Sequence, residues 1–157
     1  MVLYAEEVRA LGIDYGRRRI GLALSDATGL LARPWKTISG GTPARAAALL
    51  ADEIAALRQE EDGLSAIVIG FPRRLTGEPT EQTAAVATLA ERLRSLVDLP
   101  VVLQDERLSS REAESLLARR EHDWRKRKQQ LDAMSAAVIL QDYLDAVRAH
   151  FEREDQA

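Results

Sequence analysis

Short apolar runs alternate with longer amphipathic segments along most of this chain. The apolar runs have the length of β-strands, and strands are expected at residues 8–13, 19–24, 35–38, 64–69 and 100–103. The first two runs are joined by the tight turn Tyr15-Gly16, which predicts an antiparallel hairpin. The runs at 64–69 and 100–103 are mostly apolar, as strands are when both faces of their sheet are covered.

The amphipathic segments repeat their apolar residues at intervals of three to four, which predicts helices. These helices are expected from Pro43 to about Glu61, from Thr80 through Leu96, from Ser109 through Leu117, and from about Leu131 through Phe151. Thr42 followed by Pro43 is typical of a helix N-terminus. Because helices alternate with strands after the hairpin, the sequence predicts an α/β fold. Its mixed sheet is antiparallel at the start and parallel later, with helices on both faces.

The chain has 157 residues, 46% hydrophobic and 30% charged, which predicts one soluble globular domain over residues 1–157 with its core at about 8–150. It has no cysteine and two histidines, so disulfides and thiolate or imidazole-rich metal sites are not expected. No apolar run approaches the roughly 18 residues that a membrane span needs. Charged residues within the first ten positions argue against a signal peptide, and a cytoplasmic protein without a membrane partner is expected.

The basic residues are clustered, although the net charge is −3. The clusters are Arg17–Arg19, Arg73-Arg74 and the segment 119–128, which holds six basic residues. Each cluster alone could be a solvated turn. All three lie next to segments that carry acidic residues, so we expect them to contact phosphates.

Three acidic residues are expected to meet at one edge of the sheet. Asp14 follows the first strand, and Asp132 lies in the first turn of the last helix. Asp105 and Glu106 follow the strand at 100–103. Functional groups gather at the carboxyl ends of parallel strands, and a helix packed on the sheet can bring a further residue there. Converging carboxylates repel one another unless a cation neutralises them, and Mg²⁺ prefers such oxygen ligands.

Each acidic residue also has a purely structural interpretation. Asp14 could accept hydrogen bonds within its own turn, and Asp132 could be an N-cap. Glu106 could pair with Arg107 at the surface. Asp26, which ends the second strand, could be a further ligand, but a role as a turn residue is favoured.

Four segments together resemble the bacterial YqgF/RuvX family. They are 13–26, 68–72 with Gly77, 105–114 and 132–144. The resemblance runs in order from about residue 8 to residue 145. The chain departs from the family pattern at Phe71 and at Arg73-Arg74-Leu75. These departures concern the specificity of one loop and leave the acidic residues in place.

The resemblance implies an RNase H-like fold and a cytoplasmic nuclease that uses Mg²⁺ or Mn²⁺. The catalytic and metal-binding acidic positions of the family fall on Asp14, Glu106 and Asp132. Two cations would activate the attacking water and stabilise the leaving oxygen. The residues expected to hold nucleic-acid phosphates are Arg17, Arg18, Arg73, Arg74, Lys126 and Lys128.

Processing of the 5′ end of pre-16S rRNA in ribosome biogenesis is the expected function, and resolution of Holliday junctions in DNA recombination is the alternative. A resolvase cuts two strands symmetrically and should dimerise on its junction; we expect a monomer or a weak homodimer. Two further alternatives are a nucleotide-binding module and a non-catalytic RNA-binding assembly factor. The first needs a second domain, for which 157 residues leave no room. The three acidic residues argue against the second.

Overall fold

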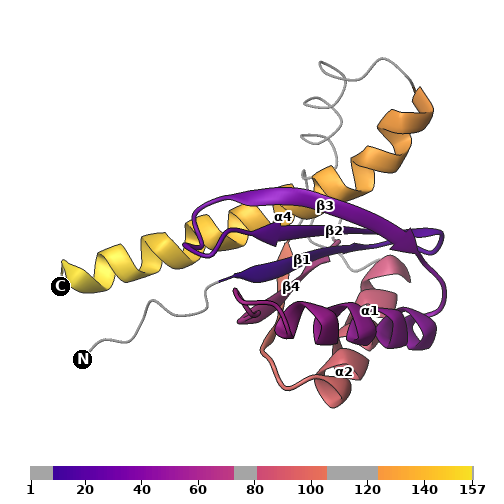
Figure 1. Cartoon of the computed structure of the whole chain (residues 1–157), viewed down its shortest axis with the longest axis horizontal. Coiled ribbons are helices and arrows are strands. Elements are labelled where there is room, and N and C mark those ends of the chain that lie inside the picture. The colour runs from indigo at the N-terminus through magenta and orange to yellow at the C-terminus, as the bar shows by residue number, and fades with distance from the viewer. Residues whose placement is uncertain (1–8, 73–80, 106–123, 157) are drawn as a thin grey trace.

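The computed structural model describes residues 9–72, 81–105 and 124–156. In these ranges five strands form one sheet in the order β3-β2-β1-β4-β5 (Figure 1). The strands are β1 (Ala10–Tyr15), β2 (Arg19–Ser25), β3 (Ala32–Ser39), β4 (Ala66–Phe71) and β5 (Val101–Asp105). β2 pairs antiparallel with β1 and β3, whereas β4 pairs parallel with β1 and β5. The predicted mixed sheet is therefore confirmed.

Helices cover both faces of this sheet, as the sequence predicts. The described helices are α1 (Pro43–Arg58), α2 (Glu81–Leu96) and α4 (Trp124–Asp155). α1 and α2 pack on one face, and α4 crosses the other face (Figure 1). The Thr42 side chain accepts a hydrogen bond from the Arg45 N–H at 3.2 Å, and Pro43 begins the helix, so the predicted start of α1 is confirmed. Among the described residues, none of the helices has a hydrophobic stretch that could span a membrane.

The two faces of the sheet carry side chains of different size. Leu11, Ile13 and Tyr15 of β1 belong to the large cluster that α1 and α2 cover. The strand residues in the cluster under α4 are mainly small, and they include Ala10 and Ala23. Because small side chains fill little space between a helix and a sheet, the backbone of α4 can lie close to β1 and β2.

Two of the element boundaries that differ from the predictions concern acidic residues. β1 extends to Tyr15, so Asp14 lies inside the strand and does not follow it. α4 begins at Trp124 and not near Leu131, so Asp132 lies well inside the helix. The interpretation of Asp132 as a first-turn residue or an N-cap is therefore wrong. The Arg, Lys and Gln residues before Leu131 have high helix propensity, which extends the helix beyond its apolar stripe.

β3 is longer than the predicted run at 35–38 and includes Pro34. A proline cannot donate a backbone hydrogen bond, but β3 is an edge strand, where this loss is tolerated. The register of β2 with β3 shifts between Leu22 and Ala23, next to the residue that pairs with Pro34. The helix predicted from Ser109 lies outside the described residues.

Candidate functional site

Asp14 lies near the end of β1, on the face of the sheet that α4 covers. A Cβ atom on Gly12 would meet α4, and side chains two residues apart in a strand share a face. Asp14 therefore faces the same side as Gly12. It is partly buried, and its cross-strand partner on β2 is Gly21.

α4 lies directly on the β1–β2 hairpin because two glycines leave room for its backbone. A Cβ on Gly21 would come within 1.9 Å of the Asp132 carbonyl oxygen, and a Cβ on Gly12 within 2.8 Å of the Ala136 carbonyl oxygen. Any larger residue would push the helix away at both points. The structure thus places Asp132 over Gly21, which is the cross-strand partner of Asp14.

Arg19 binds the Asp132 side chain from the start of β2. Its Nε donates a hydrogen bond to Asp132 Oδ2 at 2.6 Å, and the pair is partly buried. The sequence predicts that Arg19 begins the second strand and belongs to a basic cluster, but it does not indicate a pairing with Asp132. The glycine at position 21, inside an otherwise apolar strand, is the signal that marks a close backbone approach there.

The parallel strands β1, β4 and β5 end at the same edge of the sheet. Ile13 is in register with Ile69, and Ile69 is in register with Leu103. Asp105 is the exposed last residue of β5 and lies at this edge. Glu106 follows it directly but lies outside the described residues, so its position at the site stays a prediction.

Asp14 and Asp132 are suited by their chemistry to hold a hard divalent cation. Both offer carboxylate oxygens, which such cations prefer to nitrogen or sulfur, and both are partly buried. Within the described ranges, no group of three or more Asp, Glu, His or Cys side chains is placed to hold a metal ion. A third acidic ligand would have to come from outside these ranges, where Glu106 lies.

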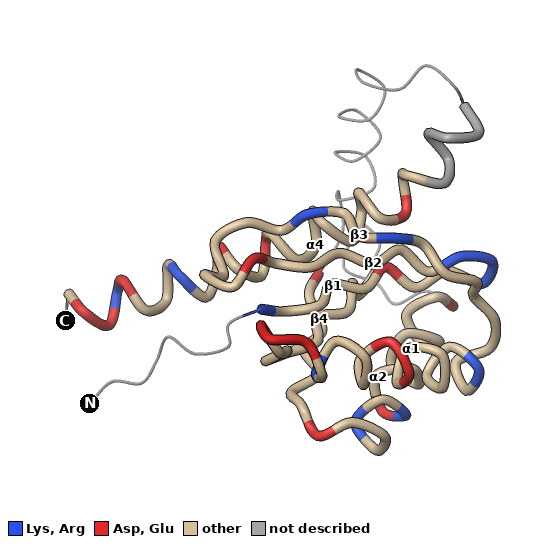
Figure 2. The backbone as a smooth tube through the Cα atoms, viewed as in Figure 1, with Lys and Arg blue, Asp and Glu red and all other residues tan. Residues whose placement is uncertain are grey.

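A basic turn stands beside this edge of the sheet. Arg17 and Arg18 lie in the β1–β2 turn and are exposed, and Figure 2 shows this turn as a blue segment at one end of the hairpin. The other predicted phosphate contacts are not tested. Arg73 and Arg74 lie outside the described residues, and only the backbone is described for Lys126 and Lys128 of α4.

Hydrogen bonds from two neighbouring segments fix this turn. The Tyr15 hydroxyl donates to the Gly41 carbonyl at 2.6 Å, and Gln82 Nε2 of α2 donates to the Tyr15 carbonyl at 2.7 Å. The Gly40 N–H donates to the Arg18 carbonyl at 2.8 Å. Burial raises the pKa of the Tyr15 phenol above its ordinary value, and the Arg17 charge offsets part of that rise. The phenol therefore stays a hydrogen-bond donor at neutral pH.

Asp26 lies at the opposite edge of the sheet. β2 runs antiparallel to β1, and Leu24 pairs with Leu11 near the start of β1. The Asp26 carboxylate accepts hydrogen bonds from Thr28 Oγ1 at 2.6 Å and from the backbone N–H of Leu30 at 2.9 Å. The favoured interpretation of Asp26 as a turn residue agrees with these contacts, and its position separates it from Asp14.

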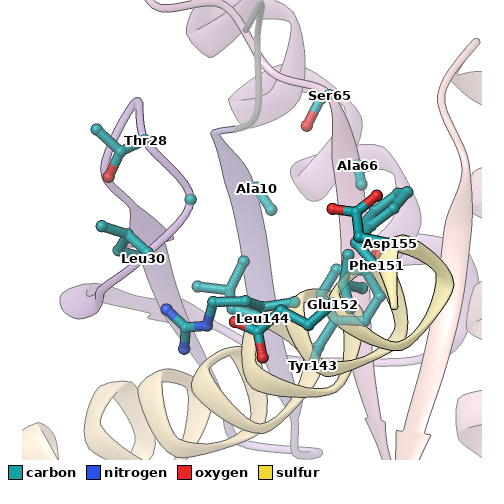
Figure 3. A pocket seen from close by; sticks show the side chains of 13 residues that line it. Ala10, Thr28, Leu30, Ser65, Ala66, Tyr143, Leu144, Phe151, Glu152 and Asp155 are labelled. Atoms are coloured by element: carbon teal, nitrogen blue, oxygen red, sulfur yellow. The ribbon is translucent and has the colours of Figure 1, made fainter. Parts of the chain in front are cut away.

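A cavity of about 360 Å³ lies elsewhere, and neither Asp14 nor Asp132 is among its lining residues (Figure 3). It opens between the second half of α4, the start of β1 and the β2–β3 turn, and its lining includes Ala10, Leu30, Tyr143 and Phe151. This lining is mainly apolar. The cavity is therefore separate from the candidate site at Asp14 and Asp132.

Comparison with known proteins identifies the family. The family model RuvX, described as Holliday junction resolvase, matches residues 8–146. A Chloroflexus aggregans protein named "Putative pre-16S rRNA nuclease" is 40% identical over 145 residues, which are 92% of this chain and 99% of the relative. A Geobacillus kaustophilus protein of the same name is 39% identical over 141 residues, which are 90% of this chain and 100% of the relative.

Among solved structures, T. thermophilus RuvC in complex with a Holliday junction substrate aligns with 89% of this chain and 95% of its own, with a TM-score of 0.49 and 13% identity. The mixed sheet with helices on both faces agrees with the RNase H-like fold that the resemblance implies. The family match and the two relatives each cover about nine tenths of the chain. The chain therefore belongs to the RuvX family.

Proposed function

We propose that this RuvX-family nuclease hydrolyses phosphodiester bonds with Mg²⁺ or Mn²⁺ at Asp14 and Asp132, and that Glu106 supplies the third acidic ligand. The observation that carries the proposal is the contact of α4 with Gly21. This contact puts Asp132 beside the cross-strand partner of Asp14. Two carboxylates at the carboxyl edge of parallel strands are an arrangement that can bind cations together with a substrate phosphate.

The described side chains would bind and orient the reacting groups. A pair of bound cations supplies an activated water and a stabilised leaving oxygen. Asp14 would hold cations from the sheet, and Asp132 would hold them from the helix. Because β1 and α4 are both packed elements, the two carboxylates would keep their separation when substrate binds.

Arg17 and Arg18 are proposed to bind the phosphates next to the scissile bond. They are exposed, and the hydrogen bonds of Tyr15 and Gly40 hold their turn in place. Contacts of this kind fix the position of a nucleic acid and do not read its sequence. Arg73, Arg74, Lys126 and Lys128 are proposed to extend the same contacts along the substrate.

The proposed substrate is the 5′ end of pre-16S rRNA in the cytoplasm. Pre-16S rRNA is chosen because relatives at about 40% identity are named "Putative pre-16S rRNA nuclease". A four-way DNA junction is the second candidate, because the matching family is described as a Holliday junction resolvase. The two substrates make different demands on the protein. Symmetric junction cleavage needs two active sites and therefore a dimer, whereas trimming one RNA end needs only one.

The test is a cleavage panel with Mg²⁺ that compares an RNA carrying the 5′ end of pre-16S rRNA with a four-way DNA junction. Wild type, Asp14→Asn and the control Lys36→Gln are measured in parallel; Lys36 pairs with Glu53 of α1 on the other face of the sheet. The wild type and the control should cut the RNA, and Asp14→Asn should not. Cleavage that survives both Asp14→Asn and EDTA would refute the proposal. Symmetric cutting of the junction alone, by a dimer, would select the second substrate.

A further inference from the structure

Arg19 holds the carboxylate of Asp132 across the interface between β2 and α4. Nε of Arg19 donates to Asp132 Oδ2 at 2.6 Å, and the two side chains are 35% and 23% exposed. The residues are 113 positions apart in the sequence, so this ion pair forms only when α4 packs on the hairpin. Water and salt screen such a partly buried pair less than they screen a pair at the surface.

This ion pair lies at the proposed metal site. Arg19 and Gly21 are two residues apart in β2, so they face the same side of the sheet. Gly21 is in turn covered by the Asp132 backbone and paired with Asp14. The guanidinium that binds Asp132 therefore lies on the same face of the sheet as Asp14. A guanidinium does not lose its proton in the working pH range. Arg19 therefore keeps its positive charge at the site.

We propose that Arg19 is the resident counterion of the acidic site and competes with the divalent cation for Asp132; this inference rests on the proposed function. Carboxylates that converge without a positive charge destabilise the fold, and the Arg19 guanidinium supplies that charge in the metal-free protein. A cation bound to Asp132 would meet the same guanidinium as a like charge, and it would have to share or displace the bond to Oδ2. Arg19 therefore stabilises the metal-free fold and weakens cation binding.

Calorimetric titration of Mn²⁺ into the full chain, without nucleic acid, tests this proposal. Arg19→Gln should bind Mn²⁺ about 3- to 10-fold more tightly than wild type, because a nearby positive charge is gone. Arg19→Lys keeps the charge and should stay within about twofold of wild type. The matched control is Lys36→Gln, which removes the 2.8 Å pair with Glu53 on the opposite face of the sheet and should leave the Mn²⁺ affinity unchanged.

Thermal unfolding supplies a second readout that does not depend on activity. In EDTA, Arg19→Gln should melt at a lower temperature than wild type, because Asp132 has lost its counterion. Saturating Mn²⁺ should then raise the melting temperature of Arg19→Gln by more than it raises that of wild type, since tighter binding stabilises the folded state further.

Two outcomes separate this inference from the proposed function. If wild type binds Mn²⁺ and folded Arg19→Gln binds it equally or more weakly, the counterion role is wrong and the metal site stands. If wild type binds no Mn²⁺ without nucleic acid, the inference is wrong, and the cleavage panel decides the proposed function separately. Should Arg19→Gln not fold, the wild-type protein still decides the matter by NMR. Saturating Mg²⁺ should shift the Nε resonance of Arg19, and an unmoved resonance would overturn the inference.

Discussion

The carboxylate of Asp26 accepts hydrogen bonds from the Thr28 hydroxyl and from the backbone N–H groups of Leu30 and Leu31. The pKa of Asp26 lies below its ordinary value, mainly because of the hydrogen bond from Thr28. A carboxyl group with a lowered folded-state pKa stabilises the fold above the unfolded-state pKa. That stabilisation disappears as the pH falls through the folded-state pKa.

Asp26→Ala should therefore lower the free energy of unfolding by about 1 kcal/mol at pH 7. Because the wild-type carboxylate becomes protonated in acid, the difference between the two proteins should shrink below about pH 4. Urea denaturation at pH 7 and at pH 3 measures this. Asp62→Ala, which removes another exposed carboxylate from a turn, is the control and should change the free energy of unfolding at pH 7 by less. A difference for Asp26→Ala that grows in acid would contradict the account.

The sequence predicts the acidic residues more readily than the groups that hold them. Asp14 is predictable because a short apolar strand leads directly to it. The pairing of Arg19 with Asp132 is not predictable from local pattern, since the two residues are 113 positions apart and meet only through the packing of α4. Glu106 stays a prediction, because it lies outside the described residues.

The position of α4 on the sheet depends on two glycines. Gly12 faces Ala136 and Gly21 faces Asp132, and in both places a Cβ atom would approach the helix backbone closer than real Cβ contacts allow. A glycine in a strand has a cost in conformational entropy. The close approach of α4 explains why glycine occupies these two positions. The same approach places Asp132 over Gly21.

Gly21→Ala should force α4 away from β2, because the obstructing atom is a backbone oxygen at 1.9 Å and cannot rotate aside. We expect a loss of about 3 kcal/mol in the free energy of unfolding. We also expect weaker Mn²⁺ binding by the protein that remains folded. Chemical denaturation and Mn²⁺ titration measure the two effects. A variant with wild-type stability and wild-type Mn²⁺ affinity would show that α4 does not hold Asp132 in this way.

Hydrophobic patterning predicted the type and order of all the described strands and helices, but not all of their ends. Apolar runs and alternating patterns indicate which residues are buried. They therefore predict the ends of β1, β4 and β5 to within about two residues. The pattern does not predict the start of α4, because its first residues are mostly charged and a charged segment carries no apolar stripe. The antiparallel start and the parallel later strands followed from the short turn and from the long helical connections.

The charge of the protein is uneven although its net value is only −3. Arg17 and Arg18 are exposed at the carboxyl edge of the parallel strands, beside the acidic site. Electrostatic attraction to a phosphate backbone should therefore be local to this edge. It should weaken with salt in proportion to the number of phosphates that the protein binds.

The double variant Arg17→Gln/Arg18→Gln should bind nucleic acid more weakly and with a smaller salt dependence. The slope of log K against log salt should fall by about one for each phosphate that the variant no longer neutralises. Fluorescence anisotropy across a salt series measures the slope. The control is Arg58→Gln/Arg92→Gln, which removes two exposed arginines from α1 and α2 on the other face of the sheet. An equal decrease of slope in both double variants would mean that the basic turn does not bind phosphates specifically.

Asp14 and a divalent cation are proposed to act together in phosphodiester hydrolysis. The most direct measurement is the single-turnover cleavage rate of an RNA with the 5′ end of pre-16S rRNA, for wild type and Asp14→Asn, with saturating Mg²⁺ and again with EDTA. We predict that Asp14→Asn lowers the rate by about 10³-fold or more, equivalent to about 4 kcal/mol of transition-state stabilisation. EDTA should abolish cleavage by wild type. A rate for Asp14→Asn within tenfold of wild type, or wild-type cleavage that continues in EDTA, would contradict the claim.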